Sequence, residues 1–255
     1  MEQYLPAFDT EEINIYEIEN QIKNQENLTN EIKNEIIEYI LDNLYKYTNL
    51  KRFICSNYRF KSSKLPELPN SLIELYCSRC NLKELPKNLP ISLENIYCSL
   101  NRITKLPKEL PNGLILLDCS NNFLKNLPKL PNSLKNLDCC NNSLKELPKI
   151  LPDTLFSLLC INNYLNDLDN FPDLPDTLTT LLCSIQTYSF STQDEINTIR
   201  NTQSKNRNFK RLNLLNKNLL LEHSAMITMN PKRIERLLES GEISFFDDSF
   251  SSLTS

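Results

Sequence analysis

The chain has 255 residues, 40% of them hydrophobic, with nine cysteines, two glycines, no tryptophan and a formal net charge of −4. This mildly negative charge and a pI of about 5.3 argue against a general nucleic-acid-binding or membrane-surface protein. The first forty residues contain no apolar run typical of a signal peptide, and no stretch approaches the length of a membrane span. We therefore expect a cytoplasmic protein whose thiols stay reduced.

Residues 1–49 are predicted to form a helical N-terminal cap. Asp9 and Glu12 match a capping box, in which Asp9 caps a helix and Glu12 reaches back to its first turn. A second helix is expected to begin near Thr29, because isoleucine and leucine recur at helical spacing after it. Such a cap would cover the apolar end and the unpaired strand edge of the repeats that follow. The segment 28–41 also resembles a degenerate F-box, which recruits a ubiquitin-ligase scaffold, although Thr29 stands where that module has proline.

Residues 50–188 contain seven copies of one frame, in which Leu-x-x-Leu-x precedes a cysteine and x-x-Asn-x-Leu-x-x-Leu-Pro follows it in the regular copies. The cysteines recur every 20–23 residues, at Cys55, Cys77, Cys98, Cys119, Cys139, Cys160 and Cys183. A period in the low twenties with this frame is the signature of a leucine-rich repeat. We therefore expect short parallel strands, one per coil, stacked into a solenoid.

Alternation along each predicted strand separates an inner from an outer side. Leu137 and Cys139 share the inner face, whereas Asp138 and Cys140 point the other way. One coil cannot bury its apolar side chains alone, but stacked coils form a continuous core. The seven cysteines are thus predicted to be small core residues.

Asparagine recurs three residues after the cysteine, where the strand bends into the loop. Backbone groups turn inward there and need hydrogen-bond partners, and an amide side chain offers both a donor and an acceptor. We predict a stacked ladder formed by Asn101, Asn122, Asn142 and Asn163. Tyr58, Cys80 and Gln186 hold this position in the flanking copies, and cysteine is an accepted variant of the repeat.

One outward residue of each strand forms a row that changes from aromatic to acidic to aliphatic. After Ile54, the row contains Tyr76, Tyr97, Asp118, Asp138, Leu159 and Leu182. We predict that these six residues bind a protein or peptide with a mixed or basic anchor. The alternative is that they are only the exposed side of a sheet, covered in part by the C-terminal helices.

A second row consists of Lys87, Lys108, Lys129 and Lys149, each directly after a proline. Glutamates are interleaved with these lysines, so we interpret the row as a solvated edge rather than a site for an anionic partner.

Five copies carry LPxLP or LPxxLP spacers, at 65–69, 85–90, 106–111, 127–131 and 147–152. With these spacers, residues 50–186 resemble the short, proline-rich class of leucine-rich repeats in secreted bacterial effectors that act inside host cells. The cysteine variant also resembles leucine-rich-repeat proteins of large DNA viruses that infect amoebae. The resemblance implies an α/β-type horseshoe with short parallel strands on the concave face, an extended convex side, and helical caps at both ends. It also implies action in a host cytoplasm.

Residues 189–241 are predicted to form a helical C-terminal cap or accessory unit. Asn230 and Pro231 match a helix start and Gly241 a helix end. Residues 242–255 are expected to be a flexible tail.

Catalytic and metal-binding motifs find little support. Cys77 and Cys80 spell CxxC, but zinc usually needs a second ligand pair and the repeat frame assigns both thiols to the core. The chain has one histidine, His223, which leaves little basis for a catalytic triad. We expect neither a cofactor nor a metal.

The sequence thus predicts a non-enzymatic protein–protein interaction module. The main alternative is a ubiquitin-ligase substrate adaptor that uses the F-box-like segment, and a third possibility is a structural protein that assembles through its open ends. The identity of the partner and the oligomeric state stay open.

Overall fold

The computed structural model describes residues 5–7, 9–25, 28–165, 171–185, 188–190, 194, 196–201 and 203, with the backbone alone at 184, 185 and 188–190. All of these residues belong to one compact unit within residues 1–203. Within the described residues, no helix is both long enough and apolar enough to cross a membrane.

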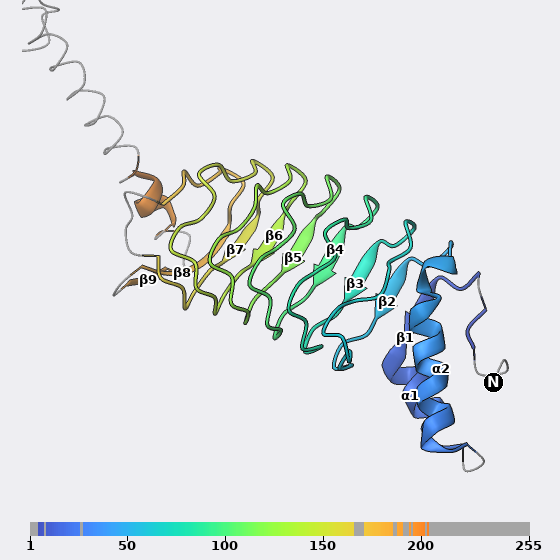
Figure 1. Ribbon diagram of the computed structural model, residues 1–255. Helices are drawn as coiled ribbons and strands as arrows, with labels where there is room; N and C mark the ends of the chain where they lie inside the picture. The colour runs from blue at the N-terminus through green and yellow to red at the C-terminus, as the bar shows by residue number, and fades with distance from the viewer. Residues whose placement is uncertain are drawn as a thin grey trace, which may run out of the picture. The chain divides into compact units, whose positions relative to one another are not determined.

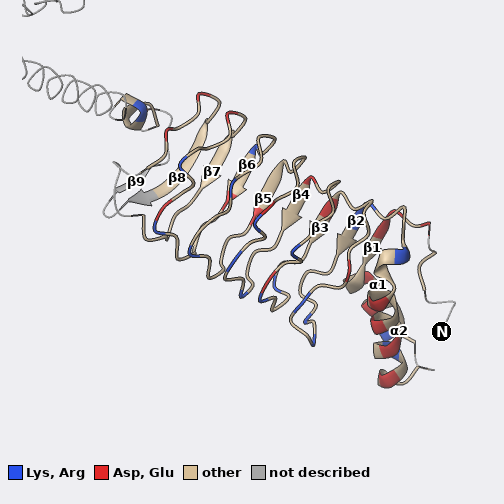
Figure 2. Cartoon of the chain, turned by 45° about the horizontal axis from the view of Figure 1, so that its top comes forward, with Lys and Arg blue, Asp and Glu red and all other residues tan. Residues whose placement is uncertain are grey.

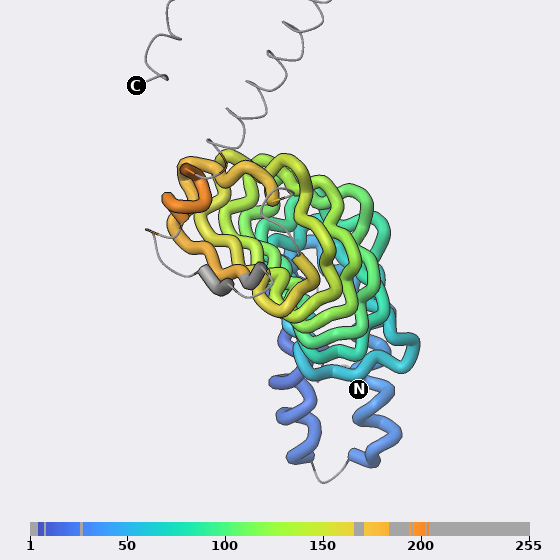
Figure 3. Tube along the Cα trace, turned by 90° about the vertical axis from the view of Figure 1, so that its left-hand side faces the viewer, coloured from blue at the N-terminus to red at the C-terminus, as the bar shows by residue number. Residues whose placement is uncertain are grey.

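Seven short strands, one per repeat, lie side by side in chain order (Figure 1). They are β2 (Arg52–Ile54), β3 (Glu74–Tyr76), β4 (Asn95–Tyr97), β5 (Leu116–Asp118), β6 (Asn136–Asp138), β7 (Ser157–Leu159) and β8 (Thr180–Ile185). Each pairs in parallel with the next, and equivalent residues of successive coils face each other. From β2 to β7 the chain returns through turns and extended segments without a helix. The predicted solenoid is confirmed, and Figure 3 shows its coils following one another along the stack.

The core runs through the interior of these coils. The middle residue of each strand is buried, as Leu75, Leu117 and Leu158 show, and so is the cysteine that follows the strand. Leucines from the loops, among them Leu134 and Leu144, close the interior from the other sides. A fully buried leucine contributes roughly 1.5–3 kcal/mol, and this gain recurs at every coil.

The N-terminal end combines helices with an additional strand. It comprises β1 (Glu12–Asn14), α1 (Ile15–Lys23), α2 (Asn30–Asp42) and the 3-10 helix η2 (Leu44–Lys46). The start of α2 agrees with the sequence, since Thr29 Oγ1 accepts a hydrogen bond from the backbone N–H of Ile32 at 3.3 Å. Ile36, Ile40 and Leu44 are fully buried and belong to the same core cluster as the repeats.

The predicted capping box at Asp9 and Glu12 is wrong. Glu12 lies in β1, which pairs in parallel with β2, and α1 begins only at Ile15 with Asn14 as its cap. The backbone N–H groups of the chain entering β2 need acceptors, and β1 extends the sheet to supply them. This pairing with residues about 40 positions away overrides the local helix signal.

The C-terminal end of the stack is closed by a hairpin and a helical segment. Strand β9 (Tyr188–Phe190) pairs antiparallel with β8. Ile196 and Ile199, from the helical residues 196–201, are buried in the core. Gln203 Nε2 donates to the carbonyl of Pro172 at 2.9 Å, which ties this segment to the last coil. The remainder of the predicted C-terminal helices, from 204 to 241, and the tail at 242–255 lie outside the described residues.

Candidate partner-binding face

Asparagine amides hold the end of each central strand. The Nδ2 group of Asn122 donates to the carbonyls of Cys98, Cys119 and Ser120 at 3.0–3.1 Å. Its Oδ1 accepts from the N–H of Ile103 at 2.9 Å, so this one amide bridges two coils. The same pattern recurs at Asn101, Asn142 and Asn163.

At the start of the array, Cys80 takes the place of the asparagine. Its thiol donates to the carbonyl of Cys55 at 2.9 Å, the bond that Asn101 Nδ2 makes to the carbonyl of Cys77 one coil later. Among the described residues, no group of three or more His, Cys, Asp or Glu side chains could hold a metal ion. Cys80 thus takes the place of the asparagine in the hydrogen-bond row, and Cys77 is buried in the core.

The in-register thiols are enclosed in the core. Cys77, Cys98 and Cys119 are fully buried, and burial, the largest effect, raises the pKa of each well above its ordinary value. Cys140, expected on the outer side, is also only 8% exposed. Burial and the neighbouring Asp138 carboxylate raise its pKa to about 12. A thiol that stays protonated is a poor nucleophile.

A second row of hydrogen bonds, at the start of each strand, was not predicted. Ser133 Oγ donates to the carbonyls of Asn112 and Leu114 in the preceding coil at 2.7 and 2.6 Å. Ser92, Thr154 and Thr177 also donate to two carbonyls of the preceding coil, and Ser71 donates to one, that of Leu50. Gly113 interrupts the row. The signal was present in the sequence as Ser or Thr two residues after each second proline, but a lone hydroxyl in a polar loop does not reveal its acceptor.

The predicted binding residues lie in one row across the sheet. The Cα register joins Tyr76 to Tyr97, Asp118, Asp138, Leu159 and Leu182, strand by strand. All six side chains are half-buried and point outward. Neighbouring positions of such a row are about 4.8 Å apart. We refer to this row as the strand face.

The aromatic end of the strand face is rigidly held. The rings of Tyr76 and Tyr97 stack with their centroids 4.6 Å apart and an interplanar angle of 6°. The Tyr76 hydroxyl donates to Glu74 Oε2 at 3.0 Å. Burial, followed by this bond to a carboxylate, raises the pKa of Tyr76 to about 12, so the phenol stays neutral at physiological pH.

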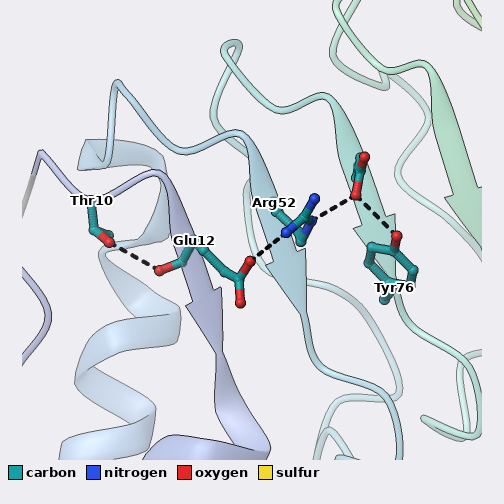
Figure 4. A network of polar contacts seen from close by, with 5 residues as sticks. Thr10, Glu12, Arg52 and Tyr76 are labelled. Carbon is teal, nitrogen blue, oxygen red and sulfur yellow. Dashed lines mark hydrogen bonds and ion pairs between the residues drawn. The ribbon is translucent and has the colours of Figure 1, made fainter.

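Charges beside this end are paired with one another, as Figure 4 shows. Arg52 donates from Nε to Glu74 and from Nη1 to Glu12, both at 2.7 Å, and thereby bridges two carboxylates from the strands on either side. Its hydrogen bond is the largest effect that lowers the pKa of Glu74. The Arg52 side chain is 45% exposed, so the network orients side chains more than it stabilises the fold.

The centre of the strand face carries two carboxylates in direct register, Asp118 and Asp138. Asp118 Oδ1 accepts from the N–H and the hydroxyl of Ser120 at 3.0 and 2.7 Å. Asp138 Oδ1 accepts from the N–H of Cys140 at 3.0 Å. Within the described part of the chain, no lysine or arginine forms an ion pair with either.

The far end of the strand face is aliphatic. Leu159 and Leu182 are half-buried neighbours in register, and Phe156, just before β7, is 52% exposed. The row thus presents an aromatic, an acidic and an aliphatic section, each on its own strands.

Solved structures similar to the chain are bacterial leucine-rich proteins. YopM, a leucine-rich effector protein from Yersinia pestis, is 30% identical with a TM-score of 0.51, and the match covers 67% of this chain and 52% of YopM. YopM from Yersinia enterocolitica is 31% identical with a TM-score of 0.45 over 57% of this chain and 36% of that one. The fold is a leucine-rich-repeat solenoid. A leucine-rich-repeat domain of a Shigella effector is 31% identical with a TM-score of 0.42, covering 54% of this chain and 59% of that one.

The solenoid spans about half the length of the first YopM structure. No family model and no curated protein matches the chain.

The lysines of the second predicted row lie on the loops of the solenoid. Lys87, Lys108, Lys129 and Lys149 are all exposed, and blue segments recur on successive loops in Figure 2. Acidic residues accompany the lysines of these loops, and Lys64 forms an ion pair with Glu84 at 2.9 Å. This mixture of signs agrees with a solvated edge.

Proposed function

We propose that the chain is a non-enzymatic interaction module that binds a protein partner on its strand face. The observation that carries this proposal is the composition of the row from Tyr76 to Leu182. Packing of the solenoid requires none of its stacked tyrosines, adjacent carboxylates or outward leucines, because the core is formed by the opposite side of each strand. Aromatic and aliphatic anchors with polar neighbours are typical of protein interfaces.

The architecture suits such a role energetically. The solenoid holds the strand face in place through the two rows of inter-coil hydrogen bonds and the continuous core. A preformed surface loses little conformational entropy on binding, so more of the contact energy appears as affinity. Leucine-rich-repeat solenoids are generally interaction modules, and two of the similar structures are described as effectors.

For residues 1–49 we propose a cap rather than a ubiquitin-ligase adaptor. Ile36, Ile37, Ile40 and Leu41 of α2, which would form the apolar surface of an F-box-like module, are all buried in the core. We further propose that 50–188 is the repeat domain, that 189–241 continues as a C-terminal cap, and that the protein acts in a host cytoplasm. The last point is supported by the resemblance to effector repeats and by the absence of disulfides among the described cysteines.

The strand face can be tested by affinity capture from eukaryotic cell lysate. The double variant Tyr97→Ala with Asp118→Lys should lose the partners that the wild type captures, while its melting temperature stays nearly unchanged. A matched control, Phe123→Ala with Lys125→Asp, makes the same kinds of change at exposed positions outside the strand face. Equal recovery of partners by the wild type and the strand-face variant would contradict the proposal.

Deletion of residues 1–48 distinguishes the cap hypothesis from the adaptor hypothesis. Removal of a cap should expose the first coil and cause aggregation. A soluble truncated chain that still binds its target but loses a ubiquitin-ligase scaffold would instead favour the adaptor.

A further inference from the structure

We propose that the strand face receives an arginine side chain from an extended segment of a protein partner, with an apolar side chain two residues further along that segment. This inference rests on the proposed function and specifies the partner's chemistry at the centre of the same row. Asp118 and Asp138 would bind the guanidinium, Tyr97 would stack against it, and Leu159 would contact the apolar residue.

The charge distribution of the sheet supports a cationic partner. At the N-terminal end, the chain itself places Arg52 between Glu12 and Glu74, with both N···O distances at 2.7 Å. At the centre, Asp118 and Asp138 occupy adjacent strands in register, and no described cation pairs with either. Like charges directly opposite each other on a sheet are destabilising, and a cation from outside would remove that repulsion.

The orientation of the two carboxylates leaves acceptors available. Each uses Oδ1 for a hydrogen bond to the backbone two residues further along, at Ser120 and Cys140. The Cys140 thiol also hydrogen-bonds to the Asp138 side chain, whereas no described hydrogen bond or ion pair involves Asp118 Oδ2. Two carboxylate oxygens on strands about 4.8 Å apart match the spread of donors on one planar guanidinium.

The neighbouring aromatic ring favours arginine over lysine. Tyr97 precedes Asp118 in the row, and its ring is stacked on Tyr76. A guanidinium is planar, can bind two carboxylates at once and stacks on aromatic faces, whereas an ammonium group is a strongly hydrated point charge.

The spacing of the row specifies the apolar residue of the partner. From the midpoint of the two aspartates to Leu159 is one and a half strand spacings, or about 7 Å. Side chains two residues apart on an extended segment, which share one side, are also about 7 Å apart. An arginine between the aspartates therefore brings the side chain two residues along over Leu159.

Selection from a random twelve-residue peptide library displayed on phage tests this inference without a known partner. The full chain is immobilised as wild type, as Asp118→Asn with Asp138→Asn, and as Glu109→Gln with Glu146→Gln. The asparagine variant keeps the shape and the Oδ1 acceptors but removes both charges. The glutamine variant removes two charges from exposed loop positions outside the strand face.

We expect wild type and the glutamine control to enrich peptides with arginine followed two positions later by an apolar residue. Synthetic copies of these peptides should bind the asparagine variant at least about tenfold more weakly, which is typical for the loss of a charge-assisted bidentate contact. Replacement of their arginine by lysine should also weaken binding to the wild type.

Two outcomes overturn the inference and differ in what they imply for the proposed function. If the selected peptides lack arginine but lose binding to the Tyr97→Ala variant, the strand face is a binding site with another preference. If selected peptides bind all variants equally, or if no peptide is enriched, both the inference and the proposed function fail.

Discussion

The two ends of each strand are held by different side chains. At the strand exit, asparagine amides such as Asn122 are buried and make four side-chain hydrogen bonds, two within their own coil and two to the preceding coil. At the strand entrance, a hydroxyl such as that of Ser133 donates to two carbonyls from a partly exposed position. Both rows join the same coils, yet only the entrance row contains a glycine, at position 113.

The difference shows how burial decides which contact the fold can lose. Carbonyls at the strand exit face the interior, where water cannot replace a missing donor and an unpaired group costs about 1–3 kcal/mol. Carbonyls at the strand entrance are close to solvent, so a missing hydroxyl leaves them hydrated. The chain therefore tolerates Gly113 at the entrance, whereas its central coils all keep asparagine at the exit.

Alkaline pH should have the largest effect on the free energy of unfolding. The reason is that thiols lie beside the strand exit, whereas the side chains at the strand entrance carry only hydroxyls. Thiols with a strongly raised pKa stay protonated in the folded chain, at Cys55, Cys77, Cys98, Cys119, Cys139 and Cys160. In the unfolded chain they ionise above about pH 8.5. Their stabilising contribution is complete below that pH and decreases above it, by about 1.4 kcal/mol per thiol and pH unit.

Urea unfolding at about pH 7.5 and about pH 9.5 in a reducing buffer measures this dependence. The variant Cys98→Ala should reduce the slope by the contribution of one thiol. A free energy of unfolding that stays constant over this range would contradict the burial of the thiols.

Replacing Asn122 by alanine should have the next largest effect. The change leaves buried carbonyls and one N–H without partners, and we expect a loss of roughly 3 kcal/mol or more in the free energy of unfolding. The adjacent Asn121→Ala is the matched control, since Asn121 is exposed and its substitution costs only about 1 kcal/mol for a left-handed φ of 54°. Chemical denaturation of both variants decides whether the buried amide, rather than the turn, stabilises the exit.

Introducing serine at Gly113 should restore the entrance row and stabilise the solenoid. A Cβ atom at this position would meet no other atom within 4 Å. The new hydroxyl can donate to the preceding coil as Ser92 and Ser133 do. Gly113→Ser should therefore gain about 1 kcal/mol beyond Gly113→Ala, which changes only the chain entropy. Equal melting temperatures of these two variants would show that the hydroxyl row does not contribute to stability.

The smallest effect is expected at Leu100, in the turn beside the asparagine row. The residue before each ladder position has a positive φ, and Leu100 adopts 56° where Asn121, Asn141 and Asn162 stand in the following coils. Asparagine accepts this conformation better than leucine, and the Leu100 side chain is 42% exposed. Leu100→Asn should raise stability by about 0.5–1 kcal/mol, and Asn121→Leu should lower it by a similar amount. Differential scanning calorimetry can resolve both shifts.

The interior of the solenoid could be predicted because it repeats. The alternation of Leu137 and Cys139 with Asp138, recurring every 20–23 residues, identifies strands, inner faces and outer rows without knowledge of long-range contacts. The same periodicity placed Tyr97 and Asp118 on one row. It could not show that no cation of the described residues pairs with Asp118, since that depends on every charged group that reaches the row.

The sequence by itself determined the stacked coils, the buried cysteines and the asparagine position, because each follows from a local pattern that every copy repeats. Only the tertiary structure decided that Glu12 lies in a strand that extends the sheet instead of in a capping box, and that Arg52 pairs with the carboxylates on either side of it. Both depend on residues 22 to 40 positions apart along the chain, which no local pattern relates. The strand face depends on both the sequence and the tertiary structure. The repeat aligns its side chains, and the folded chain determines which of their charges form ion pairs.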